Sequence, residues 1–251
     1  KGATRFALLG LAGDFLDHVA TFADHFKTQT RDCCGAAKQY LSGLMQAGRK
    51  NMERMAEVVP DADDQVLQHF LSNSPWDERA VIDQVACEAD IVLGGRKDSC
   101  LLIDESGFQK KGCKSVGVKR QWLGRQGKVD NGQVGVFAAL AAGDRVTPID
   151  VRLYLPKDWA DDPERCLQAG VPEEEIQFRS KHDLALEMVE QARALGVRYK
   201  WVGADAFYGE KPGFLNALDD MGQQFLIDVH KNQHVYLNDP APYVPERRSR
   251  R

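Results

Sequence analysis

The chain has 251 residues, of which 43% are hydrophobic and 28% are charged, and its formal net charge is −4 at pH 7. This length and composition predict a soluble globular protein of one or two domains, and no apolar stretch approaches the roughly 20 residues that span a membrane. The net negative charge gives no overall sign of nucleic-acid binding, so such a role would have to come from local clusters of lysine and arginine.

The six cysteines show no spacing typical of a zinc or thiol-redox motif, because no two of them are separated by two residues. We therefore expect reduced thiols and a cytoplasmic protein. The apolar residues 6–12 are too few for the core of a signal peptide, so no signal peptide is expected. The chain begins with Lys1 rather than Met, which suggests that the native start lies upstream.

Residues 1–96 are predicted to form a helical domain. Apolar residues recur every three or four positions in the segments 31–45, 51–59 and 61–71. The sequence Ser74-Pro75-Trp76-Asp77 is typical of a helix start, with Ser74 as the cap, and that helix is expected to end at Gly94-Gly95. This domain is a candidate for DNA binding, although small helical bundles serve many purposes.

From Lys97 onward the pattern changes to strands, and the first of them ends in acidic residues. In the segment 99–108, a short apolar run (residues 100–103) is followed at once by Asp104 and Glu105 and then by Gly107. Such a run predicts a buried strand. Asp104 would then be held on a rigid element while still reaching solvent or a ligand. Taken alone, these residues favour the simpler interpretation of a strand end followed by a turn.

A second strand-like run, residues 199–209, also ends in an aspartate, Asp205, followed by aromatic residues and Gly209. If the two strands are parallel neighbours, Asp104 and Asp205 project side by side at the same edge of the sheet. Two carboxylates so close together repel each other and need a cation or a shared proton. Oxygen ligands suit Mg²⁺ or Mn²⁺, and a pair of such ions can stabilise both oxygens of a phosphoryl displacement.

The order of the predicted elements gives the fold class. After the Asp104 strand we expect a meander of antiparallel strands, with a tight hairpin at Asp130-Asn131-Gly132, and then a helical crossover before the Asp205 strand. This order is that of an α/β ribonuclease-H-like mixed sheet, here preceded by the helical domain. The meander is expected at 115–123, 133–142 and 146–155, the crossover helices at 162–170 and 180–196, and the last helix and strand at 212–221 and 224–229.

A basic stretch follows the first candidate acid. No acidic residue lies between Ser106 and Val129. Lysine and arginine supply most contacts to nucleic-acid phosphates, so this stretch is a candidate DNA-binding surface. The candidate phosphate contacts are Lys110, Lys111, Lys119 and Arg120. Lys119 and Arg120 are consecutive and point to opposite faces of their strand, so only one of them is expected to contact a given DNA segment.

Two tryptophans, Trp122 and Trp159, lie in or near the same region. Aromatic rings of this kind can stack on extruded bases. Packing in the protein core is the favoured interpretation for both residues.

Four blocks of sequence together resemble the DDE transposases of bacterial insertion sequences, specifically family seven-hundred-and-one within the insertion sequence four superfamily. The blocks are 104–118 (DESGFQKKGCKSVGV), 133–137 (QVGVF), 153–159 (LYLPKDW) and 203–209 (GADAFYG). They occur in the order of that family, and the similarity covers most of the chain from about Phe22 onward.

The resemblance implies a cut-and-paste transposase, in which two aspartates and one glutamate hold two Mg²⁺ or Mn²⁺ ions for DNA cleavage and strand transfer. Asp104 would be the first acid and Asp205 the second. It also implies double-stranded DNA partners, namely the terminal inverted repeats and the target DNA, together with a homodimer and association with the nucleoid.

The resemblance places the third acid on a helix beyond an inserted domain. The expected division is therefore a helical domain at 1–96, a catalytic core at 97–230, and the start of an insertion or linker at 231–251. No glutamate of this chain stands in the family's context for that acid. We therefore expect the chain to be truncated relative to the family, to bind metal weakly and to be catalytically incomplete.

Two other interpretations remain open. A truncated transposase can keep its DNA-binding ability without catalysis and act as an inhibitor of the full-length enzyme. A different ribonuclease-H-like nuclease acting on RNA or on junctions is a further alternative, although the insertion-sequence motifs argue against it.

Overall fold

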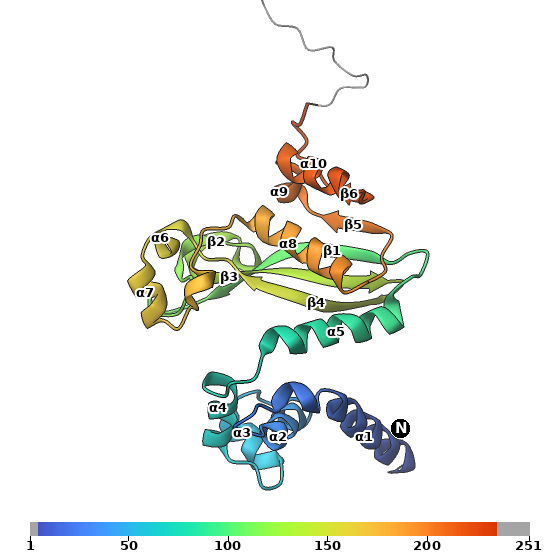
Figure 1. Cartoon of the computed structure of the whole chain (residues 1–251), viewed down its shortest axis with the longest axis vertical. Helices are drawn as coiled ribbons and strands as arrows, with labels where there is room; N and C mark the ends of the chain where they lie inside the picture. Colours follow the sequence, from blue (N-terminus) through green and yellow to red (C-terminus); the bar gives the residue numbers. More distant parts are fainter. Residues whose placement is uncertain (1–4, 235–251) are drawn as a thin grey trace, which may run out of the picture. The chain divides into compact units, whose positions relative to one another are not determined.

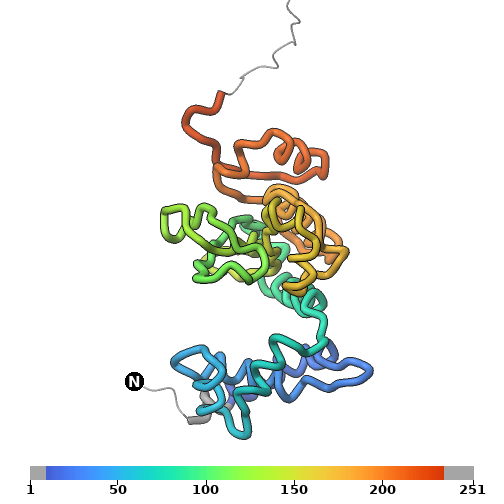
Figure 2. The backbone as a smooth tube through the Cα atoms, turned by 90° about the vertical axis from the view of Figure 1, so that its left-hand side faces the viewer, coloured from blue at the N-terminus to red at the C-terminus, as the bar shows by residue number. Residues whose placement is uncertain are grey.

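The computed structural model describes residues 5–234, and it describes their side chains from Gly10 onward. The chain divides into two compact units, residues 1–92 and residues 93–251, and each unit is described by itself. Figure 1 labels the elements of both units, and Figure 2 traces the backbone through them. Most of the insertion or linker expected at 231–251 lies outside the described residues. No helix in the described part of the chain is long and apolar enough to cross a membrane.

The first unit is helical. Its interior is an aromatic cluster in which Phe26, Phe70 and Trp76 pack with ring centroids 5.4–5.6 Å apart. Asn51 and Asp63 cap the third and fourth helices by accepting hydrogen bonds from backbone N–H groups. The helices are α1 (Arg5–Thr21), the short η1 (Ala23–Phe26), α2 (Cys34–Gln46), α3 (Met52–Val58), α4 (Asp64–Ser72) and α5 (Glu78–Leu93), the last of which reaches the boundary between the units.

The start of α5 differs from the expectation. The helix begins at Glu78, and the Asp77 side chain accepts hydrogen bonds from the backbone N–H groups of Arg79 and Ala80. Asp77 therefore caps the helix in place of Ser74, whose hydroxyl lies near His69 instead. Both residue types can cap a helix, and here Asp77, the residue directly before the helix, takes that role.

The second unit is built on a six-stranded mixed sheet with helices, and the predicted ribonuclease-H-like fold class is confirmed (Figure 1). The first strand pairs antiparallel with the third, which pairs antiparallel with the second and the fourth. On its other side the first strand pairs parallel with the fifth, which pairs parallel with the sixth. The strands are β1 (Cys100–Gln109), β2 (Lys119–Leu123), β3 (Lys128–Ala142), β4 (Arg145–Leu153), β5 (Trp201–Ala204) and β6 (Phe225–Ile227).

The hairpin predicted at Asp130-Asn131-Gly132 is wrong, because these residues lie inside β3. The chain instead reverses at the short helical turn η2 (Gly124–Gln126), which is followed by Gly127 with a φ of 60°. Gly132 serves a different purpose, since a Cβ atom there would lie 2.5 Å from the backbone oxygen of Phe108. The glycine therefore permits a close approach of two strands, a need that the sequence does not distinguish from a turn.

Helices cover one face of this sheet. The longest, α8 (Lys181–Ala194), contacts β3 and β4 through buried apolar residues. It starts with a capping box, in which Ser180 and Asp183 each bind the backbone N–H of the other. The other helical elements of the unit are α6 (Lys157–Ala160), α7 (Pro163–Gln168), η3 (Glu173–Glu175), α9 (Ala206–Gly209) and α10 (Pro212–Asp220).

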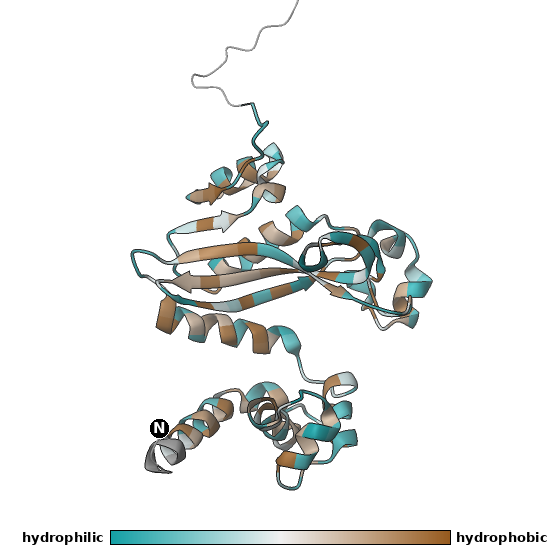
Figure 3. Ribbon diagram, turned by 180° about the vertical axis from the view of Figure 1, so that it is seen from behind, coloured by the Kyte–Doolittle hydropathy of each residue, from teal (hydrophilic) through white to brown (hydrophobic). Residues whose placement is uncertain are grey.

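The two faces of the sheet differ in their exposure. Because side chains alternate along a strand, Leu101 and Ile103 of β1 lie on one face and Leu102 lies on the other. Leu101 and Ile103 are 0% and 2% exposed, whereas Leu102 is 40% exposed. Val151 and Leu153 of β4 share the face of Leu102 by strand register and are also exposed. Figure 3 views the sheet from the side opposite to Figure 1, with its residues coloured by hydropathy.

Candidate active site

Strand register brings the two candidate aspartates together. β1 and β5 run parallel, and their last registered pair is Ile103 with Ala204. Asp104, which lies within β1 rather than at its end, and Asp205, which directly follows β5, are the next positions in this register. They therefore lie beside each other and on the same face of the sheet, at the point where the pairing of the two strands stops. Both residues are exposed. The pairing that the sequence predicted for these two residues is therefore present.

Each aspartate is oriented by the backbone that follows it. One carboxylate oxygen of Asp104 accepts a hydrogen bond from the N–H of Glu105 over 2.7 Å. Asp205 caps α9 and accepts from the N–H of Phe207 over 3.0 Å. These hydrogen bonds orient each carboxylate group and leave oxygen lone pairs for a further ligand.

The electrostatics of the pair favour a cation. The pKa of Asp104 is raised above its ordinary value, chiefly because its carboxyl group loses part of its hydration. The negative charge of Asp205 raises this pKa further, whereas the hydrogen bond from the Glu105 N–H opposes the shift. A bound cation would relieve the repulsion between the carboxylates. Their oxygens are also the ligand type that Mg²⁺ and Mn²⁺ prefer.

These two aspartates therefore fit a divalent metal as ligands. Among residues 5–234, no group of three or more His, Cys, Asp or Glu side chains could hold a metal ion. Within the described part of the chain the candidate site is thus a pair of acids rather than a triad.

Glu105 lies next to Asp104 in sequence but on the opposite face of β1. Its carboxylate binds Lys181 Nζ over 2.9 Å and accepts a hydrogen bond from the Tyr208 hydroxyl over 3.3 Å. Burial raises the pKa of Tyr208 strongly, and the negative charge of Glu105 adds to this effect. The tyrosine therefore remains a hydrogen-bond donor.

The sequence analysis missed both Lys181 and Tyr208. The one available signal was a lysine directly after the helix cap Ser180, because a cation in the first turn opposes the helix dipole and needs a compensating partner.

The candidate DNA contacts lie in and after the loop that joins β1 to β2. Lys111, Lys119 and Arg120 are exposed and Lys110 is half-buried. Lys119 Nζ forms an ion pair with Asp158 over 2.7 Å, so its charge is already balanced on the protein surface. The four residues therefore differ in how available they are to a phosphate.

Side chains from neighbouring elements brace this loop at its carbonyl oxygens. Asn131 Nδ2 donates to the carbonyls of Lys110 and Gly112 over 2.7 and 2.8 Å. Arg165 donates to the carbonyl of Cys113 over 3.1 Å, and its guanidinium lies 3.6 Å from the centre of the Trp159 ring. The loop is thus fixed in position and presents its lysines from a defined surface.

The expectation that both tryptophans belong to the core is confirmed for one and wrong for the other. Trp159 is 0% exposed and donates from Nε1 to the carbonyl of Val118 over 2.9 Å. Trp122 is 55% exposed. It lies on β2, where consecutive side chains alternate between faces, and the buried partner on that strand is Leu123.

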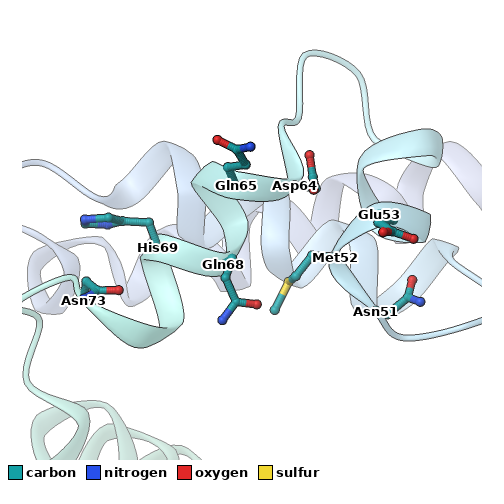
Figure 4. Close-up of a pocket in the computed structure, with 8 residues that line it drawn as sticks. All are labelled: Asn51, Met52, Glu53, Asp64, Gln65, Gln68, His69 and Asn73. Carbon is teal, nitrogen blue, oxygen red and sulfur yellow. The ribbon is translucent and has the colours of Figure 1, made fainter.

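A hollow of about 600 Å³ lies between α3 and α4 in the helical unit (Figure 4). Amide side chains line it, including Asn51, Gln65 and Gln68. Glu53 and Asp64 lie in the same lining and would repel phosphate groups. We therefore assign no DNA contact to this hollow.

Comparisons with known proteins agree with the geometry. A family model described as "DDE superfamily endonuclease" matches residues 21–251. The "Probable transposase for insertion sequence element IS701" of Microchaete diplosiphon is 32% identical over 191 residues, which are 75% of this chain and 47% of that relative. The chain therefore spans about half the length of the relative it matches.

Proposed function

The chain belongs to the DDE superfamily endonucleases, and we propose that Asp104 and Asp205 hold the divalent metal ions of a site for DNA cleavage and strand transfer during transposition. The observation that carries this proposal is the parallel register of β1 and β5, which places the two aspartates side by side. We propose two ions, Mg²⁺ or Mn²⁺. Bound there, they would activate a water molecule and stabilise the oxygens of the reacting phosphodiester.

The residues of the chain itself have two roles in this proposal. Asp104 and Asp205 bind and orient the metal from a rigid sheet edge. The braced loop after β1 contacts the DNA backbone through Lys110 and Lys111, with Lys119 and Arg120 on the adjoining strand. Lys119 would have to exchange its ion pair with Asp158 for a phosphate, so we expect it to contribute least.

We propose the terminal inverted repeats of the element and its target DNA as the substrates. In this proposal residues 97–230 form the catalytic core, the helical domain of residues 1–96 contributes to DNA binding, and two copies act together on the DNA as a homodimer. The site of action would be the nucleoid in the cytoplasm. The similarity to a probable transposase of an insertion sequence supports these assignments.

A titration of Mn²⁺ into the chain tests the metal site. We expect binding in the native chain and its loss in Asp104→Asn and in Asp205→Asn. Asp161→Asn is the matched control, because Asp161 is an exposed aspartate that pairs with Lys157 on the surface. Equal Mn²⁺ binding by the native chain and the two site variants would reject the metal site.

A second candidate function is DNA binding without catalysis, as in an inhibitory transposase fragment. It is favoured by one observation, that only a pair of acids meets within the described residues. Under this second function, the 251-residue chain would bind DNA without cleaving it at a measurable rate. A nicking assay distinguishes the two functions, since Mg²⁺-dependent nicking that is lost in Asp104→Ala would establish catalysis by this chain.

A further inference from the structure

Behind the two aspartates, on the face of β1 that helices cover, three polar side chains meet from three elements. Glu105 comes from β1, Lys181 is the first residue of α8, and Tyr208 lies in α9. Glu105 binds Lys181 through one carboxylate oxygen and Tyr208 through the other, over 2.9 and 3.3 Å. The residue that follows Asp104 is therefore tied to both α8 and α9.

The segment that follows Asp205 is tied to the same end of α8. Lys181 Nζ lies 5.1 Å from the centre of the Phe207 ring. His182 stacks on that ring with centroids 4.8 Å apart, and its Nε2 lies 3.2 Å from the carbonyl oxygen of Phe207. The N–H of Phe207 in turn binds the carboxylate of Asp205. The first two residues of α8 thus contact Phe207, the residue whose backbone N–H binds this aspartate.

These contacts are shielded from water. The side chains of Lys181 and Glu105 are 15% and 22% exposed, and Tyr208 is 0% exposed. An ion pair in such surroundings holds a defined geometry, because either partner alone would be poorly solvated. α9 has little room to move away, since a Cβ atom on Gly209 would lie 2.0 Å from the carbonyl oxygen of Asp228.

We infer that Lys181 and Tyr208 are positioning residues that hold the two aspartates at the spacing a divalent metal needs. They act through Glu105 on β1 and through α9 beyond β5, and they bind no metal themselves. This inference rests on the proposed metal site. Partners of this kind behind a metal ligand commonly control the affinity of the site.

Neutralising Lys181 should change the metal affinity in opposite directions, depending on whether the residue acts by positioning the aspartates or only through its charge. Removing an ammonium group from the neighbourhood of two carboxylates increases their attraction for a cation, so charge alone predicts tighter metal binding. Loss of positioning predicts weaker binding. The direction of the change in metal affinity therefore separates the two effects.

The test is a calorimetric titration of Mn²⁺ into the whole chain, its Lys181→Met variant and a Lys157→Met control. Methionine keeps most of the length of lysine, and Lys157 is an exposed lysine whose partner is Asp161. We expect Lys181→Met to bind Mn²⁺ about 10-fold more weakly, as changes to the supporting partners of metal ligands commonly do. We expect Lys157→Met to bind as the native chain does. Unchanged or tighter binding by Lys181→Met would overturn the inference.

Two further variants keep the test decisive if Lys181→Met does not fold. Tyr208→Phe removes one hydroxyl and keeps the ring, and it should weaken Mn²⁺ binding several-fold and alter the electron paramagnetic resonance spectrum of the bound ion. Lys181→Arg keeps the charge and can keep the ion pair with Glu105, so it should bind nearly as the native chain does. Native affinity and an unaltered spectrum in Tyr208→Phe would contradict positioning.

The same titration separates this inference from the proposed function. If Asp104→Asn and Asp205→Asn bind Mn²⁺ as the native chain does, the metal site is wrong and the inference fails with it. If both lose binding while Lys181→Met and Tyr208→Phe keep native affinity, the metal site stands and only the positioning role is wrong.

Discussion

The two faces of the central sheet differ, and the difference separates two consecutive acids of β1. Asp104 lies on the face where Leu102 is 40% exposed, and its carboxylate binds the N–H of the next residue. Glu105 lies on the face where Leu101 is 0% exposed, and its carboxylate is bound by Lys181 and Tyr208. One acid is thus open to a ligand, whereas the other already has its partners within the protein.

This contrast shows how a strand can separate a binding function from a supporting one. Side chains alternate between faces, so two consecutive acids point to opposite sides of the sheet: we propose the first as a metal ligand, and the second holds α8 and α9 through Lys181 and Tyr208. The open face supplies oxygen atoms that reach solvent, and the covered face supplies the contacts that hold them.

Removing an aspartate from the open face should have the largest effect on metal binding. We expect Asp104→Ala and Asp205→Ala to weaken Mn²⁺ binding by more than about 100-fold, above the range for supporting residues. The free energy of unfolding without metal should not fall in Asp104→Ala, because the change removes one of two repelling charges. Asp205→Ala also removes the cap of α9, so it should lower the free energy of unfolding by about 1 kcal/mol. Calorimetric titration and urea denaturation measure the two quantities. A loss of metal binding accompanied by unfolding would contradict the assignment of the open face to binding.

Substituting each of two neighbouring leucines compares how much the two faces contribute to the free energy of unfolding. Leu101→Ala creates a cavity on the covered face and should lower the free energy of unfolding by roughly 2–5 kcal/mol. Leu102→Ala trims a half-exposed side chain and should cost about 1 kcal/mol or less. Urea denaturation of both variants measures the difference. Equal losses of stability would mean that the face of Leu102 is covered in solution.

A substitution in the loop of residues 110–118, between β1 and β2, should change the affinity for DNA without changing the affinity for metal. We expect Lys111→Ala to weaken binding to duplex DNA of any sequence and to lower the slope of log affinity against log salt by about 1. Lys157→Ala is the matched control, since Lys157 is an exposed lysine on α6, outside the loop. Fluorescence anisotropy at several salt concentrations gives the slope, and an unchanged slope in Lys111→Ala would remove this residue from the DNA surface.

The smallest expected effect is on the pH dependence of stability. Partial loss of hydration of the carboxyl group and the charge of Asp205 raise the pKa of Asp104 in the folded chain. The folded state therefore binds more protons than the unfolded state between the ordinary and the raised pKa, so stability falls as pH rises through that window. Asp104→Asn should remove this fall. Urea denaturation of the metal-free chain at a series of pH values measures it, and identical pH profiles would contradict the shift.

The sequence contained enough information for the order of elements and for the parallel pairing of β1 with β5. In the sequence, the apolar run of each strand is followed by an aspartate, although β1 continues beyond Asp104 to Gln109 and β5 stops one residue before Asp205. A helical crossover between the two strands makes parallel pairing natural. The role of Asp104 and Asp205 as metal ligands stays a prediction.

Other features depended on contacts between distant residues. Gly132 resembled a turn glycine but permits the close approach of Phe108. Trp122 could not be distinguished from Trp159 because exposure depends on the register of a short strand. The role of Lys181 depends on its contact with Glu105, which lies 76 positions earlier in the chain, and the sequence alone does not show that contact.

The most direct test of the central claim is a crystal structure of the chain grown with Mn²⁺ and measured at the manganese absorption edge. We predict an anomalous peak between the carboxylates of Asp104 and Asp205, on the open face of the sheet, with Glu105 still bound to Lys181. A peak at Glu105 or elsewhere in the chain, with none between the two aspartates, would contradict the claim.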